Sequence, residues 1–268
     1  MSNERIRIAV TGAGGRMGRE VVKMVLEDPE LQLVAAIDPS NVGKDAGQLI
    51  GAEACGVAIT DDLELALVES RAEVMIDFTI PATVVPNTRT AIRLGVRPVV
   101  GTTGIAPEQI EELDKQCRDA GIGGIIAPNF SIGAILMMKF AAQAAKYMPH
   151  VEIIEYHGDQ KLDAPSGTSI KTAELIAENR RELKQGNPNE HETIEGARGG
   201  YYNGFRIHSV RLPGVFAQQE VIFGGHGQSL KIRHDSYERA GYMPGVNVAV
   251  KKVRDVVGIV YGFEHFLD

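Results

Sequence analysis

A stretch of thirteen residues, His157–Ser169, concentrates side chains that can exchange protons and bind charge. It holds the imidazole of His157, the ammonium group of Lys161, two carboxylates and a Ser-Gly-Thr turn. A positioned histidine or lysine is a common general acid or base. This stretch is therefore the first candidate for a chemical site.

The stretch lies between a strand-like run, Val151–Tyr156, and a helix-like run that begins near Ile170. Its proline and second glycine prevent either neighbour from continuing through it. Two interpretations are open from these residues alone. One is a loop in which Ser166 or Thr168 caps the helix. The other is a polar site that binds an anion at the helix N-terminus.

A glycine-rich turn near the start of the chain predicts a second site. The strand-like run Arg5–Val10 leads into a turn and an amphipathic helix, and a second strand, Leu31–Ile37, ends at an acid. Such a βαβ unit lets backbone N–H groups approach a pyrophosphate while the acid binds ribose hydroxyls. The predicted dinucleotide contacts are Gly12, Ala13, Gly14, Gly15, Arg16, Met17 and Asp38.

The turn departs from the strict G-x-G-x-x-G pattern, because Met17 takes the place of the third glycine. It fits G-x-x-G-x-x-G instead, and a purely structural turn is the alternative. Arg16 could meet a phosphate or be solvated. Asp38 is followed by Pro39-Ser40-Asn41 and not by an arginine, and a carboxylate repels a 2′-phosphate that no cation compensates. NADH is therefore expected to serve at least as well as NADPH.

Alternating strands and helices continue to residue 130 and predict a doubly wound parallel sheet. Strands are expected at 74–79, 97–100 and 122–126, and helices at 63–69, 82–94 and 107–120, with a loop and a short strand over 43–59. Ligands of such sheets lie beyond the carboxyl ends of the strands. The residues there, predicted to wall a nicotinamide pocket, are Phe78, Thr79, Gly101, Thr102, Thr103, Ala127, Pro128, Asn129 and Phe130.

The pattern changes after a long helix expected over 131–147. Strand-like runs follow at 151–156, 205–211, 219–223 and 230–234, with one helix over 170–183 and a polar loop over 184–203. Runs of strands with few helices predict an α+β domain with an open mixed sheet. A helix over 246–257 is expected to return to the first domain. The predicted fold is thus a Rossmann-type domain (1–130), a substrate-binding and oligomerisation domain (131–240) and a C-terminal segment (241–268).

The composition is that of an ordinary globular protein. Hydrophobic residues make up 44% and charged residues 24%, and the formal net charge of -7 argues against a general nucleic-acid binder. An anionic ligand would need a locally basic pocket. Cys55 and Cys117 have no metal-ligand spacing and indicate free thiols in a reducing cytoplasm. Neither a signal peptide nor a membrane span is expected, and no metal site is predicted.

The chain resembles the dihydrodipicolinate reductases of lysine and diaminopimelate synthesis. The resemblance covers essentially the whole length, and its most specific marker is the string Lys161–Thr168. Its other markers are Gly12–Gly18, Asp77–Thr79, Gly101–Gly104, Asn129–Ser131 and Ile207–Arg211. It implies reduction of hydroxy-tetrahydrodipicolinate, a small anionic dicarboxylate, with loss of water by NADH or NADPH. It also implies a homotetramer whose second domain builds the interface and closes over the cofactor.

The resemblance also implies roles for the first stretch. His157 matches the acid–base group and Lys161 a proton donor that also contacts substrate. Gly167 and Thr168 match the backbone that holds one substrate carboxylate. Ser166 is placed with this substrate-binding group, although it is expected to shape the loop.

One position departs from the family. Members commonly carry two consecutive histidines where this chain has His157-Gly158, and the second contacts a substrate carboxylate. Weaker substrate binding, or a compensating donor from elsewhere, is therefore expected with the chemistry intact.

Two other functions compete with this one. Another two-domain dehydrogenase of amino-acid metabolism would need no Asp-Ala-Pro-Ser-Gly-Thr loop. A non-catalytic dinucleotide sensor should lose His157 and Lys161. A cysteine-acylating dehydrogenase is disfavoured, because neither cysteine lies at an expected strand end.

Overall fold

The computed structural model describes residues 5–267, whose contacts divide the chain into two compact units. Unit 1 consists of the residues up to Ser131 together with those from Tyr242 onward, and unit 2 is Ile132–Gly241. Each dividing point is one residue beyond the domain boundary expected from the sequence. Within the described range, no helix combines the length and apolarity needed to cross a bilayer.

Unit 1 is built on a seven-stranded, all-parallel sheet in the order β12-β6-β5-β4-β1-β2-β3. Its strands are β1 (Ile6–Thr11), β2 (Leu31–Ile37), β3 (Ile59–Thr60), β4 (Val74–Asp77), β5 (Arg97–Val100), β6 (Gly123–Ile126) and β12 (Gly258–Tyr261). The strand order reverses between β1 and β4, which is where doubly wound sheets bind ligands. The predicted Rossmann-type fold is confirmed.

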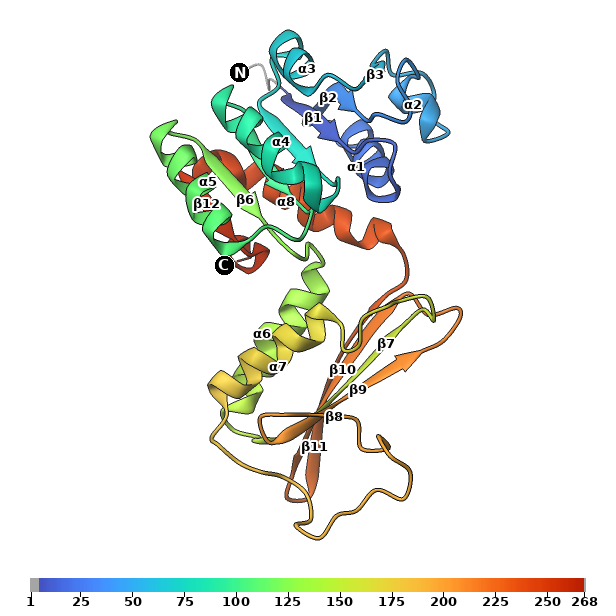
Figure 1. Ribbon diagram of the computed structural model, residues 1–268, viewed down its shortest axis with the longest axis vertical. Helices are drawn as coiled ribbons and strands as arrows, with labels where there is room; N and C mark the ends of the chain where they lie inside the picture. The colour runs from blue at the N-terminus through green and yellow to red at the C-terminus, as the bar shows by residue number, and fades with distance from the viewer. Residues whose placement is uncertain (1–4, 268) are drawn as a thin grey trace. The chain divides into compact units, whose positions relative to one another are not determined.

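Helices cover both faces of this sheet (Figure 1). α1 (Arg16–Glu27) and α8 (Met243–Lys252) contact each other, as do α3 (Leu63–Ser70) with α4 (Pro81–Arg93) and α4 with α5 (Pro107–Asp119). Consecutive strand residues point to opposite faces of the sheet, and helices cover both faces. Neighbours such as Met75 and Ile76 are therefore both fully buried. Prolines at the first turns of α4 and α5 suit positions whose N–H has no partner in the helix.

The C-terminal segment differs from the prediction of one helix over 246–257. α8 ends at Lys252, and a short 3-10 turn, Val253–Asp255, leads into β12, which pairs in parallel with β6. The apolar residues of this run fit a helix period and a buried strand equally well. Gly258, at φ 90°, makes the turn into the strand, a conformation that side chains disfavour.

Unit 2 is a five-stranded mixed sheet with two helices. The strand order is β11-β10-β7-β9-β8, with β7 and β9 parallel and the other pairs antiparallel. The elements are α6 (Ile132–Ala145), β7 (His150–His157), α7 (Gly167–Asn179), β8 (Gly200–Tyr202), β9 (Phe205–Arg211), β10 (Ala217–Gly225) and β11 (Gln228–Ser236). The predicted open mixed sheet is confirmed.

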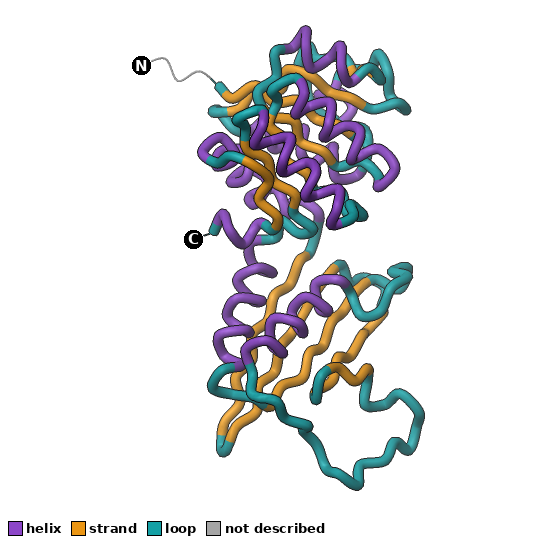
Figure 2. Tube along the Cα trace, turned by 60° about the vertical axis from the view of Figure 1, so that its left-hand side comes forward, coloured by secondary structure: helices purple, strands orange, loops and turns teal. Residues whose placement is uncertain are grey.

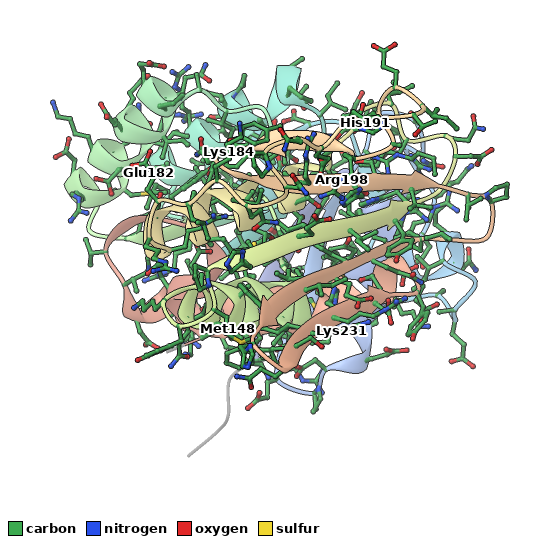
Figure 3. The ribbon with its side chains drawn as sticks, turned by 90° about the horizontal axis from the view of Figure 1, so that it is seen from below. Met148, Glu182, Lys184, His191, Arg198 and Lys231 are labelled. Atoms are coloured by element: carbon green, nitrogen blue, oxygen red, sulfur yellow. The ribbon has the colours of Figure 1, made fainter. Side chains whose placement is uncertain are left out.

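The sheet of unit 2 has two unlike faces. The inner face, which carries Val151, Ile153, Glu155 and His157 of β7, packs against α6 and α7, which lie side by side in Figures 1 and 2. The outer face carries Glu152, Ile154 and Tyr156, because successive strand residues point to opposite sides. Figure 3 labels Arg198 and Lys231, whose side chains pair with residues of this outer face.

Smaller differences concern the loops. The 43–59 segment contains a short helix, α2 (Ala46–Leu49), which Asp45 caps by accepting from Gly47 N and Gln48 N. The loop expected over 184–203 ends in a strand, β8. α7 runs from Gly167 to Asn179, whereas the sequence predicts a helix over 170–183. The helix starts earlier than predicted because its N-cap residue is Ser166.

Candidate active site

The glycine turn after β1 is held by contacts that exclude larger residues. Gly12 has φ 73°, and a Cβ there would overlap the Phe78 carbonyl oxygen. A Cβ at Gly18 would overlap the Gly12 carbonyl oxygen. These two glycines are therefore required by the fold of the turn itself.

The same turn leaves the N-terminus of α1 open to an anion. Gly15 is the N-cap residue, so no side chain caps the first turn, which also lacks acidic residues. The first N–H groups of a helix have no partner within it and carry a partial positive charge. Ala13 is buried beneath the turn, whereas Gly15 and Arg16 are exposed and Met17 is half-buried. This cradle fits the pyrophosphate of a dinucleotide.

Asp38 lies at the end of β2, as the sequence predicted, and its side chain is organised by the turn. Its carboxylate accepts hydrogen bonds from Gly14 N at 3.0 Å, Ser40 N at 2.9 Å and Asn41 Nδ2 at 3.1 Å. A Cβ at Gly14 would overlap Asn41 Nδ2, so this amide covers the turn. Sequence reasoning gave Asn41 no role, and only its position after the acid could have indicated one.

Asp77 is an organising residue that sequence reasoning also missed. Its fully buried carboxylate accepts from Thr102 Oγ1 and Thr79 Oγ1 at 2.7 Å each, and from Thr11 Oγ1 and Asn87 Nδ2 at 2.9 Å each. Thr79 N adds a further bond at 3.1 Å. These donors come from β1, α4 and the ends of β4 and β5. The network fixes the carboxyl edge of the sheet where Thr79 and Thr102 were predicted to wall a pocket.

The remaining predicted wall residues divide between core and surface. The Phe78 ring lies 6.1 Å from the ring of Phe130, and a Cβ at Gly101 would overlap Phe78. Phe130 and Ala127 are buried, Asn129 Oδ1 accepts from Ser131 N at 2.8 Å, and Thr103 and Pro128 are exposed. Unit 1 thus gathers all the predicted cofactor residues at the carboxyl edge of its sheet.

In unit 2, His157 ends β7 with its Nδ1 hydrogen-bonded to Glu155 Oε2. Glu155 is fully buried and also accepts from Arg211 Nη1 at 2.9 Å and Nη2 at 2.7 Å. Burial alone would raise the pKa of Glu155, but hydrogen bonds from His157, Arg211 and Ser209 lower it to about 2. Glu155 is therefore ionised at neutral pH, directly behind the histidine.

Lys161 is the next group along the loop. Its Nζ lies 2.6 Å from Asp163 Oδ1, and this hydrogen bond lowers the pKa of Asp163. The Lys161 side chain is 26% exposed, whereas that of Asp163 is 62% exposed. The lysine is thus held close to the body of the unit by a partner that faces solvent.

Ser166 is the N-cap residue of α7. The sequence left Ser166 and Thr168 as the two candidates for this cap. Its Oγ accepts from Ser169 N at 3.2 Å, and Ser169 Oγ donates to Gln219 Oε1 at 2.6 Å. Gln219 Nε2 then donates to Thr172 Oγ1 at 2.8 Å. The Ser166 hydroxyl is buried in this network, which holds the start of α7 to β10. The predicted contact of Ser166 with substrate stays a prediction.

Gly167 and Thr168 form the first turn of α7, at an exposed and a half-exposed position. A Cβ at Gly167 would meet nothing within 4 Å, so the space beyond this helix end is open. His157, Lys161 and the α7 N-terminus are therefore brought together in one loop of unit 2. At Gly158, by contrast, a Cβ would lie 3.2 Å from the Val215 carbonyl oxygen.

Sequence reasoning gave neither Glu155 nor Arg211 a role, although Arg211 ends the family marker Ile207–Arg211. The available signal was a charged residue two positions before His157, because residues i and i+2 of a strand share a face.

Cys117 is not placed as a reactive thiol. Burial, with a smaller contribution from Asp114, raises the pKa of Cys117 to about 12, far above that of a reactive thiol. Among residues 5–267 there is no cluster of three His, Cys, Asp or Glu side chains suited to a metal ion.

Comparisons with known proteins agree with this geometry. The family model for the dihydrodipicolinate reductase N-terminus matches residues 6–130, and that for the C-terminus matches residues 133–267. The 4-hydroxy-tetrahydrodipicolinate reductase of Desulfitobacterium hafniense is 54% identical over 99% of this chain and 100% of its own. The reductase of Listeria innocua is 52% identical over 98% and 100%.

A solved structure resembles the whole chain. The dipicolinate-bound dihydrodipicolinate reductase from Paenisporosarcina sp. TG-14 has a TM-score of 0.88 and 46% identity, covering 97% of this chain and 99% of its own. With both family models matched end to end, the chain belongs to the dihydrodipicolinate reductase family.

Proposed function

We propose that the chain reduces 4-hydroxy-tetrahydrodipicolinate, with loss of water, to tetrahydrodipicolinate at the expense of NADH or NADPH. The observation that carries this proposal is the loop of unit 2 that presents His157, Lys161 and the N-terminus of α7 together. A non-catalytic dinucleotide sensor would have no use for such a loop. The dicarboxylate bound to the Paenisporosarcina relative supports a substrate of this class.

The dinucleotide, when bound, supplies the hydride. The turn Gly12–Met17 and the uncapped start of α1 would hold its pyrophosphate, and Asp38 would accept from the ribose hydroxyls. Phe78, Thr79 and Gly101–Thr103, with Ala127–Phe130, would border the nicotinamide.

Three features of unit 2 would act on the substrate: the α7 N-terminus, His157 and Lys161. One carboxylate of the cyclic imine binds the N–H groups of Gly167 and Thr168 and the Thr168 hydroxyl, as anions do at helix N-termini. Reduction of the conjugated ring leaves an enamine, which must gain a proton. Because Nδ1 of His157 is engaged by Glu155, Nε2 is the atom that faces the substrate. Lys161 donates the proton near the developing charge.

The deciding experiment is an assay of NADH oxidation with freshly prepared substrate, followed by the loss of reduced-nicotinamide absorbance. Turnover that depends on both compounds supports the proposal. Binding of NADH without oxidation would instead identify a dinucleotide sensor. The chain is further proposed to act in the cytoplasm as a homotetramer, which light scattering after size-exclusion chromatography tests.

Cofactor choice gives a separate prediction. NADH should have a kcat/KM at least equal to that of NADPH, because Asp38 is buried at the ribose position beside the neutral Asn41 and no arginine follows it. The two values are compared in steady-state kinetics at one salt concentration. A clear preference for NADPH would refute the assignment of Asp38 to the ribose hydroxyls.

A further inference from the structure

Glu155 and Arg211 form a buried ion pair directly behind His157. Both carboxylate oxygens accept from the guanidinium group, and Oε2 also accepts from His157 Nδ1. The pair spans two strands, because His157 on β7 is aligned with Arg211 on the parallel strand β9. Glu155 is fully buried, and the Arg211 side chain is 19% exposed.

Arg211 also reaches the substrate loop. Its Nη2 donates to the Asp163 carbonyl oxygen at 2.8 Å, and its Nη1 donates to the Val210 carbonyl oxygen at the same distance. One guanidinium group thus joins β9, the carboxylate behind the histidine and the loop that carries Lys161. The histidine and the loop are held by the same two side chains.

We propose that Glu155 and Arg211 are positioning residues of the reductase, with Glu155 orienting His157 through Nδ1 and Arg211 fixing Glu155 to the substrate loop. This inference rests on the proposed function. Neither residue is proposed to touch the substrate. A bond from Nδ1 to a carboxylate fixes the orientation of the ring and its tautomer, so that Nε2 stays available to the substrate.

The charged groups linked to His157 come from three elements. Glu155 of the same strand bonds the ring, Arg211 of β9 bonds Glu155, and Asp163 of the loop accepts from Arg211 through its carbonyl and from Lys161 through its carboxylate. On β10, Ala217 is aligned with His157 and Gln219 with Glu155, and neither is ionisable. Glu155 is therefore the anion in direct contact with the ring, and its removal should dominate any change.

The first test is the variant Glu155→Gln, which keeps the shape of the side chain and removes its charge. We expect kcat to fall by about 10²-fold with KM changed little. Removing a carboxylate behind a metal-bound histidine typically costs about 10–100-fold in activity. Removing one behind a catalytic histidine can cost about 10⁴-fold.

The matched control is Glu152→Gln on the outer face of the same strand. Glu152 also pairs with a histidine and an arginine, His208 Nε2 at 2.6 Å and Arg198 Nη2 at 2.7 Å. Its kcat should stay within about twofold of that of the unchanged chain, as for most partly exposed positions. Equal losses in the two variants would overturn the inference.

A second variant separates positioning from stability, because Glu155→Gln leaves Arg211 as a buried cation without its partner. Combining Glu155→Gln with Arg211→Met removes both charges, which restores stability more readily than losing one. If the pair acted only in stability, this double variant would regain the original kcat. We expect it to fold and to remain as slow as Glu155→Gln.

The tautomer of the His157 ring, followed by NMR of 15N-labelled imidazole, is independent of turnover. The Nδ1–H signature should weaken in Glu155→Gln, which removes the carboxylate that accepts from Nδ1, and stay unchanged in Glu152→Gln. If the unchanged chain fails to oxidise NADH while this signature still weakens in Glu155→Gln, the proposed function fails and the coupling of Glu155 to His157 stands. An unchanged signature with unchanged kcat would overturn the inference and leave the proposed function intact.

Discussion

Two clusters of the same three residue types lie on opposite faces of β7. Glu155, His157 and Arg211 form the inner cluster, and Glu152, His208 and Arg198 form the outer cluster. The inner carboxylate is fully buried, whereas the Glu152 side chain is 29% exposed. Hydrogen bonds hold the pKa of Glu155 at about 2 against the effect of burial, and the pKa of Glu152 is lowered in the same way.

The clusters differ in what their arginines hold. Arg211 donates to the loop that carries Lys161, whereas Arg198 ends the long polar loop and also pairs with Glu190 at 3.1 Å. Residue type alone thus cannot identify a reacting histidine. The two histidines are distinguished by the loop that the arginine of each cluster contacts.

The largest expected difference is between the two histidines. His157→Gln should lower kcat by about 10²–10⁴-fold, the usual contribution of a general acid or base. His208→Gln should leave kcat within about twofold, since its partner Glu152 is on the outer face. Steady-state kinetics at saturating substrate measure both. Comparable losses in the two variants would remove the distinction between the clusters.

The lysines extend the comparison to the neighbouring residues. Lys161→Ala should lower kcat by about 10²-fold through loss of a proton donor. Lys231→Ala, which removes an outer-face cation 3.3 Å from Glu220, should have little effect. Near-normal turnover of Lys161→Ala at saturating substrate would show that Lys161 is not the proton donor.

The stability of the protein in acid should depend on the ionisation of Glu155 in the inner cluster. The pKa of Glu155 is lowered from 4.5 to about 2, so its stabilising effect is complete above 4.5 and is lost as the pH falls towards 2. At 1.36 kcal/mol per unit, the effect is about 3 kcal/mol. The unchanged chain should therefore have a higher denaturant midpoint than Glu155→Gln at neutral pH, and the two midpoints should converge as the pH falls towards 2. A constant gap between them across this range would contradict the linkage.

The smallest predicted effect concerns Gly158, where the family commonly has a second histidine. Gly158→His should lower KM severalfold and leave kcat unchanged, provided that the Val215 carbonyl moves by the few tenths of an ångström that a Cβ needs. Gly158→Ala is the control, because it imposes the same shift without the imidazole. An unchanged or higher KM for the histidine variant would indicate that another group already binds this carboxylate.

Sequence patterns predicted the elements of unit 1 well, because buried parallel strands are short apolar runs between turn residues. They did not identify β12, because the apolar residues around Gly258 fit both the period of a helix and the run of a buried strand. They also could not assign Asp77, whose hydrogen-bond donors Thr11, Asn87 and Thr102 are far apart in sequence.

The inner cluster was predictable only in part, because the spacing puts Glu155 on the same strand face as His157 but reveals neither its burial nor its partner. The run Val151–Tyr156 contains glutamates at 152 and 155, and nothing in it says which of them α6 and α7 will cover. The partner of Glu155 comes from β9, after the long loop. Ser166 was predictable as a cap, because serine at a helix start is a local signal.

The position of β12 has a consequence for synthesis on the ribosome. β12 pairs with β6, yet all of unit 2 is translated between them. Domains usually fold as units while the chain emerges. The edge of β6 therefore stays unpaired until the last segment is made, and a nascent chain halted before α8 would present that edge to other chains or to chaperones.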